Sequence, residues 1–331
     1  MGRKDKKYST KLHDQAYNRL TSMLSFGESK AKAKQDGSIQ DKIFSRNTYR
    51  TYWKHTKYYL SYLKENHPEC TTLKKARSYV GEWLKAREEE GLSAWTIQTE
   101  AKALGKLFGI TPEDQDYYDP PKRERKDIKR SRLPVKRDKH FSESNNFEFV
   151  SFCKGTGLRK SEVTKLKGKD LVSAAEIRQM LESETDLSSW HVQALKDATQ
   201  FDDEYFLHVI GKGGRERYSP IIGEYADQIV ARMIRTLPES KVWLNVPSNA
   251  DVHSYRSYYA TEVYKRYARD IDSIPFDEIN KGTGHKYQSE VYVCRKDEKG
   301  RKLDLLAARK ASYSLGHRRV EIIANNYIRG L

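Results

Sequence analysis

The stretch SLGHRRVEIIANNYIRGL, residues 314–331, carries the most informative pattern in the chain. Its apolar side chains recur at intervals of three and four residues, which predicts an amphipathic helix packed on the rest of its domain. These side chains are Val320, Ile323, Ala324, Tyr327 and Ile328. Tyr327 lies on the apolar stripe, so the pattern leaves two interpretations open: a core tyrosine, or a tyrosine placed for chemistry.

Upstream of this helix, the sequence predicts a domain of mixed character that begins near His140. TGLRKSEVTKL, residues 156–166, belongs to a helix, a tight glycine turn and a second helix. VIGKGGRERYSPI, residues 209–221, places two β-like runs about GKGG and predicts a hairpin. Residues 291–304 predict a second hairpin, and HSYRSYYAT, residues 253–261, belongs to a helix.

The first third of the chain predicts four amphipathic helices, which suit a small bundle. Ser9 or Thr10 is the expected cap of the first helix, and the third is expected to run from about Leu73 to Trp83. Ser93 and Gly109 are expected to start and stop the fourth. The Tyr/Trp-rich second helix has its aromatics at core spacing, which favours packing over base stacking.

The segment between the two domains is rich in proline and charge and predicts a linker. We therefore expect a helical domain over 1–110, a basic linker over 111–140 and a mixed domain over 141–331, giving a mainly helical α+β fold with a small antiparallel sheet. A solvated linker and a strap along a phosphate backbone are equally good interpretations. The basic residues expected to contact DNA are Lys122, Arg123, Arg125, Lys126, Lys129, Arg130 and Arg132.

The composition of the chain limits the classes of partner that it is expected to bind. The 331 residues include 62 Lys+Arg and 46 Asp+Glu, a net charge of +16, which favours an anionic partner such as nucleic acid, although a ribosomal or membrane-surface protein can share this balance. No apolar run suits a membrane span or a signal peptide, so we expect a cytoplasmic protein. Cys70, Cys153 and Cys294 form no CxxC pair, so we expect buried or incidental thiols and no metal site.

Four stretches of the second domain, in this order, resemble the tyrosine recombinase (phage and transposon integrase) family: those at 156–166, 209–221, 253–261 and 315–328. The helical first third resembles the family's core-binding domain, chiefly in LSAWTIQTEAKALGKLF. The positions that match the family's catalytic residues are Arg159, Lys212, His253, Arg256, His317 and Tyr327. Glu162, where the family often has an acid, would brace the active site.

The resemblance implies a site-specific recombinase that needs no cofactor. Arg159 and Arg256 would offer planar forks to phosphate oxygens. A tyrosine has a pKa near 10 and is a poor nucleophile until it loses its proton, so Tyr327 would attack after passing its proton to His253. His317 would hydrogen-bond the phosphate, and Lys212 would protonate the leaving 5′-oxygen. The implied partners are double-stranded DNA, further protomers in a tetramer, and accessory DNA-bending or directionality factors. The implied origin of the protein is a bacterium or a phage.

Other interpretations remain beside this one. Arg159 and Glu162 also suit a surface ion pair. Lys212 suits an ordinary turn. His253 and Arg256 suit the solvated face of a helix. The same chemistry would suit a type IB topoisomerase-like enzyme, and the fold alone would suit a DNA-binding regulator without catalysis.

Two intervals depart from the family's pattern. Tyr327 follows His317 by ten positions where the family more often has nine, so we expect an irregular turn after Arg318 to absorb the extra residue. The long interval between Arg159 and Lys212 predicts a helical insertion, from about Ser173 to Phe201, that lies away from DNA.

Overall fold

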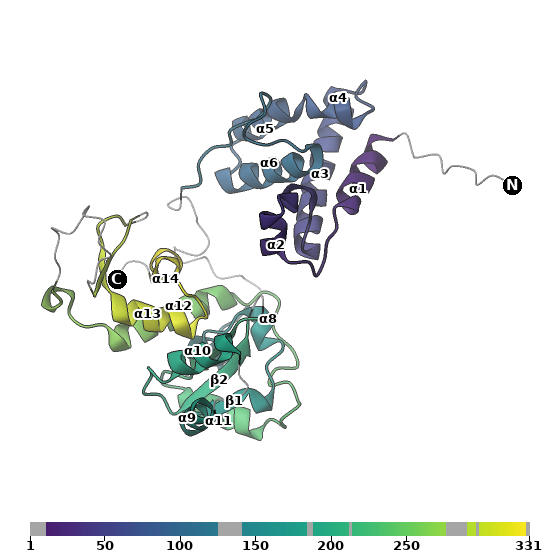
Figure 1. The fold of residues 1–331 in the computed structure, drawn as a ribbon. Helices are drawn as coiled ribbons and strands as arrows, with labels where there is room; N and C mark the ends of the chain where they lie inside the picture. The colour runs from purple at the N-terminus through teal and green to yellow at the C-terminus, as the bar shows by residue number, and fades with distance from the viewer. Residues whose placement is uncertain are drawn as a thin grey trace. The chain divides into compact units, whose positions relative to one another are not determined.

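The computed structural model describes residues 11–124, 141–183, 188–211, 214–275, 290–295 and 298–328. The chain divides into two compact units, here called unit 1, which ends at Asp127, and unit 2, which begins at Ile128 (Figure 1). The division falls inside the predicted linker, most of which lies outside the described residues.

The described part of unit 1 is built of helices, with one isolated β-bridge between Leu24 and Ile43. Its elements are α1 (Leu12–Ser22), α2 (Lys30–Gln35), the 3-10 helix η1 (Ser38–Asp41), α3 (Arg46–Asn66), α4 (Leu73–Arg77), α5 (Val80–Glu89) and α6 (Ala94–Phe108). Two expectations were wrong. Lys11, in an extended conformation, occupies the N-cap position of α1 in place of Ser9 or Thr10, because the helix begins only at Leu12. The single third helix is two, since the chain turns at Ser78 and Tyr79 before α5 begins.

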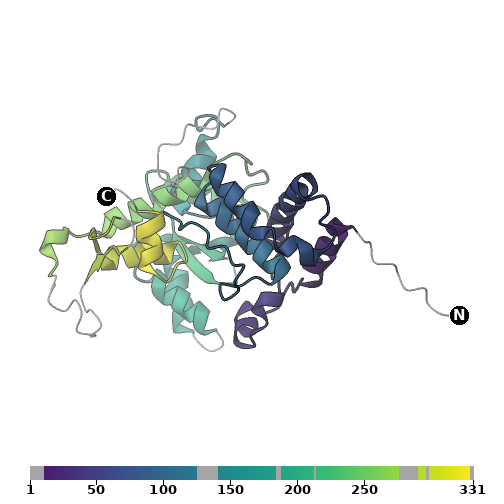
Figure 2. The same ribbon diagram turned by 90° about the horizontal axis from the view of Figure 1, so that it is seen from above.

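The core of unit 1 confirms that most aromatics of α3 pack inside, with Tyr58 as an exposed exception. Helix α3 lies against α6 in both views (Figures 1 and 2). Tyr59 is fully buried in one hydrophobic cluster, and Tyr52 and Trp53 pack against a second cluster of the unit. The ends of α6 are also as predicted: Ser93 accepts the backbone N–H of Thr96, and Gly109 adopts the left-handed conformation that glycine favours.

Unit 2 mixes helices with two small sheets, which confirms the mainly helical α+β fold. Its helices are α7 (Phe147–Thr156), α8 (Lys160–Val163), η3 (Gly168–Asp170), α9 (Ala174–Glu182), α10 (Ser189–Ala198), α11 (Ala226–Arg235), α12 (Val252–Tyr267), η4 (Ile271–Ser273), α13 (Leu305–Ser314) and α14 (Val320–Asn326). Its strands are β1 (Leu171–Ser173), β2 (Tyr205–Ile210), β3 (Glu216–Pro220), β4 (Val291–Val293) and β5 (Lys302–Asp304).

Both predicted hairpins are present, as β2–β3 and β4–β5, and β1 adds an unpredicted third strand to the first. In the β2–β3 ladder His208 lies opposite Tyr218, and Ile210 lies opposite Glu216. Side chains alternate between the two faces of a strand. Arg217 therefore lies on the other face of β3 from Glu216 and Tyr218.

Helix α10, part of the predicted insertion, belongs to the core of unit 2. It packs against β3, and its Ala194, Leu195 and Ala198 are buried with residues of α12 and α13. Removing α10 would expose this apolar surface, so it is an integral layer of the unit. Its position relative to DNA stays a prediction.

The three cysteines are free and buried, as predicted. Among the described residues, no helix combines the length and apolarity that crossing a bilayer requires.

Candidate active site around Glu162

A glycine turn places Arg159 at the start of α8. Gly157 has a φ of +61°, and a Cβ there would lie 2.3 Å from Cδ1 of Tyr259, so only glycine fits the turn. The chain then enters α8 with Arg159 in the capping position. The backbone N–H of Arg159 donates to Oε2 of Glu162 at 2.8 Å, and its Nη1 donates to Oε1 at 2.7 Å. The Arg159–Glu162 ion pair is therefore formed, but it is not the surface pair of the alternative interpretation, because the Glu162 side chain is only 5% exposed.

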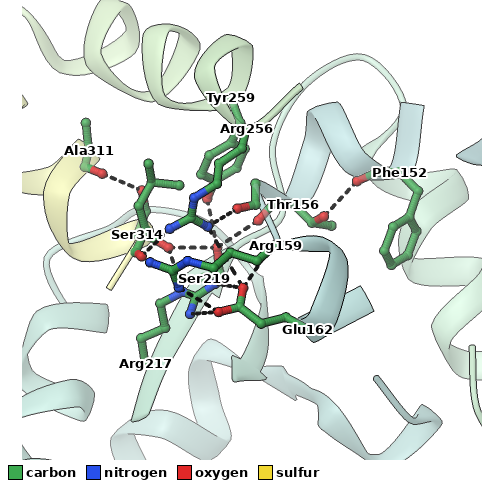
Figure 3. Close-up of polar contacts among 12 residues, drawn as sticks. Phe152, Thr156, Arg159, Glu162, Arg217, Ser219, Arg256, Tyr259, Ala311 and Ser314 are labelled. Carbon is green, nitrogen blue, oxygen red and sulfur yellow. Dashed lines mark hydrogen bonds and ion pairs between the residues drawn. The ribbon is translucent and has the colours of Figure 1, made fainter. Parts of the chain in front are cut away.

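Glu162 is held from the other side by Arg217, which the sequence analysis missed. Nη2 and Nη1 of Arg217 donate to the two carboxylate oxygens at 2.7 and 3.2 Å, and its Nε donates to the carbonyl of Ser314 at 3.0 Å (Figure 3). Both charged side chains are 5% exposed. Arg217 shares its strand face with the buried Ser219, and an arginine at such an inward position was the available signal.

Arg256 has a more enclosed position than its expected role suggests. It is 1% exposed; Nη1 donates to the carbonyl of Gly157, and Nη2 donates to that of Leu315 at 2.5 Å. Its Nη1 lies 3.9 Å from Glu162, while its buried Nε has no partner in the described part of the chain. Arg159, by contrast, keeps a third of its side chain exposed. The two arginines expected to act as equal forks therefore differ: Arg159 is accessible, and Arg256 ties together the two loops that flank it.

The cluster carries more positive charge than its carboxylate neutralises. Three guanidinium groups surround Glu162, an excess of two positive charges. Burial raises the pKa of Glu162, but the charge and hydrogen bonds of Arg217, the backbone N–H of Arg159 and the charge of Arg256 lower it to about 2. Burial and the charges of Arg217 and Arg159 lower the pKa of Arg256 to about 10. Such a site favours an anion.

Tyr327 lies beside this cluster. Its ring centroid is 5.7 Å from Cζ of Arg256, 5.4 Å from the His253 ring and 5.6 Å from the His317 ring. The side chain is half-buried and packs against the core at the end of α14. The two interpretations of Tyr327 are thus compatible, because the same ring packs on the core and faces the histidines.

The expected irregular turn before Tyr327 is confirmed. Helix α13 ends at Ser314, Gly316 is left-handed, and α14 begins only after Arg319 in an extended conformation. Ser312 fixes the turn, because its carbonyl accepts the backbone N–H of His317 at 2.8 Å. The interval from His317 to Tyr327 therefore does not run along one continuous helix.

The two histidines are tuned toward their neutral forms. Burial and the charges of Arg256, Arg159 and Arg217 lower the pKa of His317 to about 4. Loss of hydration to the surrounding protein, with the charges of Arg256 and Arg159, lowers the pKa of His253, whose side chain is still accessible to solvent. Nε2 of His317 is buried without a partner among the described residues. Near pH 7 both rings are thus neutral, and each has a ring nitrogen that can accept a hydrogen bond.

The remaining predicted residues fall elsewhere. Lys212 lies outside the described residues, as do five of the basic linker residues: Arg125, Lys126, Lys129, Arg130 and Arg132. In unit 1, Lys122 is exposed, and the guanidinium of Arg123 lies 4.6 Å from the ring centroid of Trp95. Arg123 therefore has a packing role in unit 1, whatever it does toward DNA.

Comparisons with known proteins add no support for a function beyond the geometry described above. No protein-family model matches the chain, and no curated protein matches it. Among solved structures, the chain is similar to the crystal structure of XerA recombinase, with 13% identity, a TM-score of 0.26, and coverage of 95% of this chain and 94% of that one. A likeness at this level carries no weight for function.

Proposed function

We propose that this protein is a site-specific DNA recombinase in which Tyr327 is the nucleophile. One observation carries the proposal: the half-buried Tyr327 lies beside two histidines and a guanidinium cluster with uncompensated positive charge. A phosphodiester is anionic and gains charge in its five-coordinate transition state. Fixed guanidinium groups and a tyrosine are the groups that such a reaction requires.

In the proposed step the Tyr327 oxygen bonds to phosphorus as the bond from phosphorus to the 5′-oxygen breaks. The phenol proton passes to His253, whose lowered pKa leaves it neutral and able to accept. Lys212 gives a proton to the leaving 5′-oxygen. The products are a 3′-phosphotyrosyl ester and a free 5′-hydroxyl. Attack by a 5′-hydroxyl from another strand reverses the step and completes the exchange.

The role proposed for each residue follows from the exposure and charge of its side chain. Arg159 is accessible and would bind the non-bridging phosphate oxygens, with the unpartnered Nε2 of His317 beside them. Arg217 and Glu162 would fix the orientation of Arg159, since both are buried and the Glu162 carboxylate accepts hydrogen bonds from both arginines. Unit 1 and the basic linker would hold duplex DNA, and protomers would assemble on two sites to exchange strands.

Trapping a covalent adduct tests the nucleophile. The full-length protein is incubated with duplex DNA carrying a nick near the cleavage point, so that the released fragment diffuses away and religation fails. We expect a protein–DNA adduct that maps to Tyr327 by mass spectrometry, its loss in Tyr327→Phe, and its persistence in the matched control Tyr313→Phe. An adduct formed by Tyr327→Phe would show that the nucleophile is another residue.

Two further assays separate the competing functions. Exchange between two DNA sites supports a recombinase, whereas relaxation of supercoiled DNA without exchange supports a type IB topoisomerase-like enzyme. Normal biological activity of the Arg159→Ala, Tyr327→Phe double variant would instead indicate a non-catalytic DNA-binding regulator.

A further inference from the structure

A second cluster of polar side chains lies on unit 2 and takes no part in the proposed reaction. It consists of His191 on α10, His208 on β2 and Glu216 on β3, and their three potential ligand atoms all lie within 4.8 Å of one another. Oε2 of Glu216 contacts Nδ1 of His191 and lies 3.2 Å from Nε2 of His208. All three side chains are partly exposed, so the cluster is accessible from solvent.

The antiparallel register brings these residues together. His208 pairs with Tyr218, and Ile210 pairs with Glu216, so His208 and Glu216 are diagonal neighbours on one face of the hairpin. Helix α10 packs against β3 and adds His191. No spacing along the sequence reveals the group, because its members come from three elements at positions 191, 208 and 216.

We propose that this cluster binds one divalent transition-metal ion, with Zn²⁺ as the preferred metal. Two imidazole nitrogens and one carboxylate oxygen form a set that zinc accepts, leaving a fourth position for water. Around a tetrahedral zinc the ligand atoms lie roughly 3.3 Å apart, given bonds of about 2.0–2.1 Å. The 3.2 Å between His208 and Glu216 already matches that spacing.

Tyr218 supplies a second, independent observation. Its hydroxyl lies 3.2 Å from Nε2 of His191, the nitrogen that faces away from the cluster. When Nε2 carries the proton and donates it to this hydroxyl, Nδ1 is left with the lone pair that a metal needs. Metal-bound histidines are commonly oriented by such a partner on their other nitrogen. The Tyr218 ring also stacks on His208, with centroids 4.9 Å apart and planes at 20°, which fixes the second imidazole.

A metal ion bound at this cluster would restrain the β2–β3 hairpin, in whose connecting segment Lys212 lies. His208 precedes Lys212 by four positions and Glu216 follows it by four, and His191 belongs to the helix beneath. One ion would thus fasten both strands of the hairpin to α10. Arg217 lies on the opposite face of β3, so the site stands apart from the guanidinium cluster.

Zinc titration of the full-length protein without a histidine tag tests the proposal. Competition against a chromophoric chelator gives the affinity and stoichiometry, and Co²⁺ replaces Zn²⁺ as an optical probe of coordination. We expect one equivalent bound, visible bands typical of tetrahedral Co²⁺, and a rise in melting temperature with Zn²⁺. Because changes to outer partners alone cost about 10–100-fold in metal affinity, Glu216→Gln and His208→Ala should each weaken binding by at least about 100-fold.

The matched control is His13→Ala, an exposed histidine of unit 1 beside Asp14, which should bind as the wild type does. Glu216→Gln keeps the shape of the side chain and most of its hydrogen bonds, so it separates lost ligation from lost folding, which circular dichroism checks. Absence of Zn²⁺ binding by the wild type would overturn the proposal and leave a hydrogen-bonded His–Glu–His group. Equal binding by wild type and Glu216→Gln would also overturn it.

Discussion

Among the described residues, each unit has one buried glutamate, and the two glutamates have different charged neighbours. In unit 1, Glu100 is 1% exposed and contacts His55 and Arg87, each at 3.2 Å. Arg87 is shared with a second carboxylate, that of Glu90. In unit 2, Glu162 is 5% exposed and faces three arginines. Two buried acids of similar exposure thus lie in opposite charge balances.

The difference separates a structural ion pair from the proposed anion-binding site. In unit 1 one guanidinium serves two carboxylates, so no positive charge is left over among these residues. In unit 2 one carboxylate serves three guanidinium groups, and burial makes the excess charge costly unless an anion joins it. We therefore propose that an acid outnumbered by fixed arginines marks a site for an anionic ligand, which Glu162 would help to assemble.

Removing each carboxylate in turn tests this comparison with the largest expected effect. Glu162→Gln should destabilise unit 2 by about 3–5 kcal/mol, because it leaves three buried or half-buried guanidinium groups without a counter-charge. Glu100→Gln should destabilise unit 1 less, since Arg87 keeps Glu90. Hydrogen exchange reports the two units separately and gives both free energies.

Added sulfate provides the control for that pair. An anion can replace the lost charge in unit 2, so sulfate should recover part of the stability of Glu162→Gln and none of that of Glu100→Gln. Equal losses in the two variants, with no selective response to sulfate, would contradict the distinction between the clusters.

The rate of DNA cleavage should also distinguish the Glu162 cluster from the Glu100 cluster. Arg159→Ala should slow single-turnover DNA cleavage by about 10²–10³-fold, the usual loss when one fixed donor to a developing oxyanion is removed. Arg87→Ala, the matched change in unit 1, should leave the rate at saturating DNA unchanged. A rate for Arg159→Ala within a few-fold of wild type would remove Arg159 from the reaction.

The sequence predicted the parts of this site that lie in local patterns. The glycine turn before Arg159, the β2–β3 hairpin and the break after His317 all leave local signals, because glycine and alternating residues act over a few positions. The charge balance leaves none. Arg217 meets Glu162 only when β3 lies beside α8, and Arg256 is buried only because the loops of Gly157 and Leu315 close on it.

The third prediction concerns Arg217, the residue that sequence reasoning missed. Arg217→Lys keeps the charge but cannot bond both oxygens of Glu162 and the carbonyl of Ser314 at once. We expect a loss of about 1.5–3 kcal/mol in unit 2, the usual value of a hydrogen bond to a charged group. DNA cleavage should slow while affinity for DNA changes little, because Arg217 acts through Glu162. A large loss of affinity with normal cleavage would mean that Arg217 contacts DNA directly.

The smallest expected effect is the pH dependence of unit 2 that arises from His317. The folded-state pKa of about 4 lies below the ordinary value of 6.5, so the unfolded chain binds more protons between these values. Stability from this group is complete above about pH 6.5 and is lost as the pH falls toward 4; the loss stays below ~3 kcal/mol because the ring is partly exposed. Glu162, with its pKa of about 2, loses its contribution only below its ordinary value of 4.5, which keeps the two windows nearly separate. His317→Gln should therefore flatten the stability of unit 2 between pH 6.5 and 4.5 and leave unit 1 of the same molecule unchanged. Hydrogen exchange across this range measures both units, and an unaltered slope in unit 2 would show that burial and the arginines do not lower the pKa of His317.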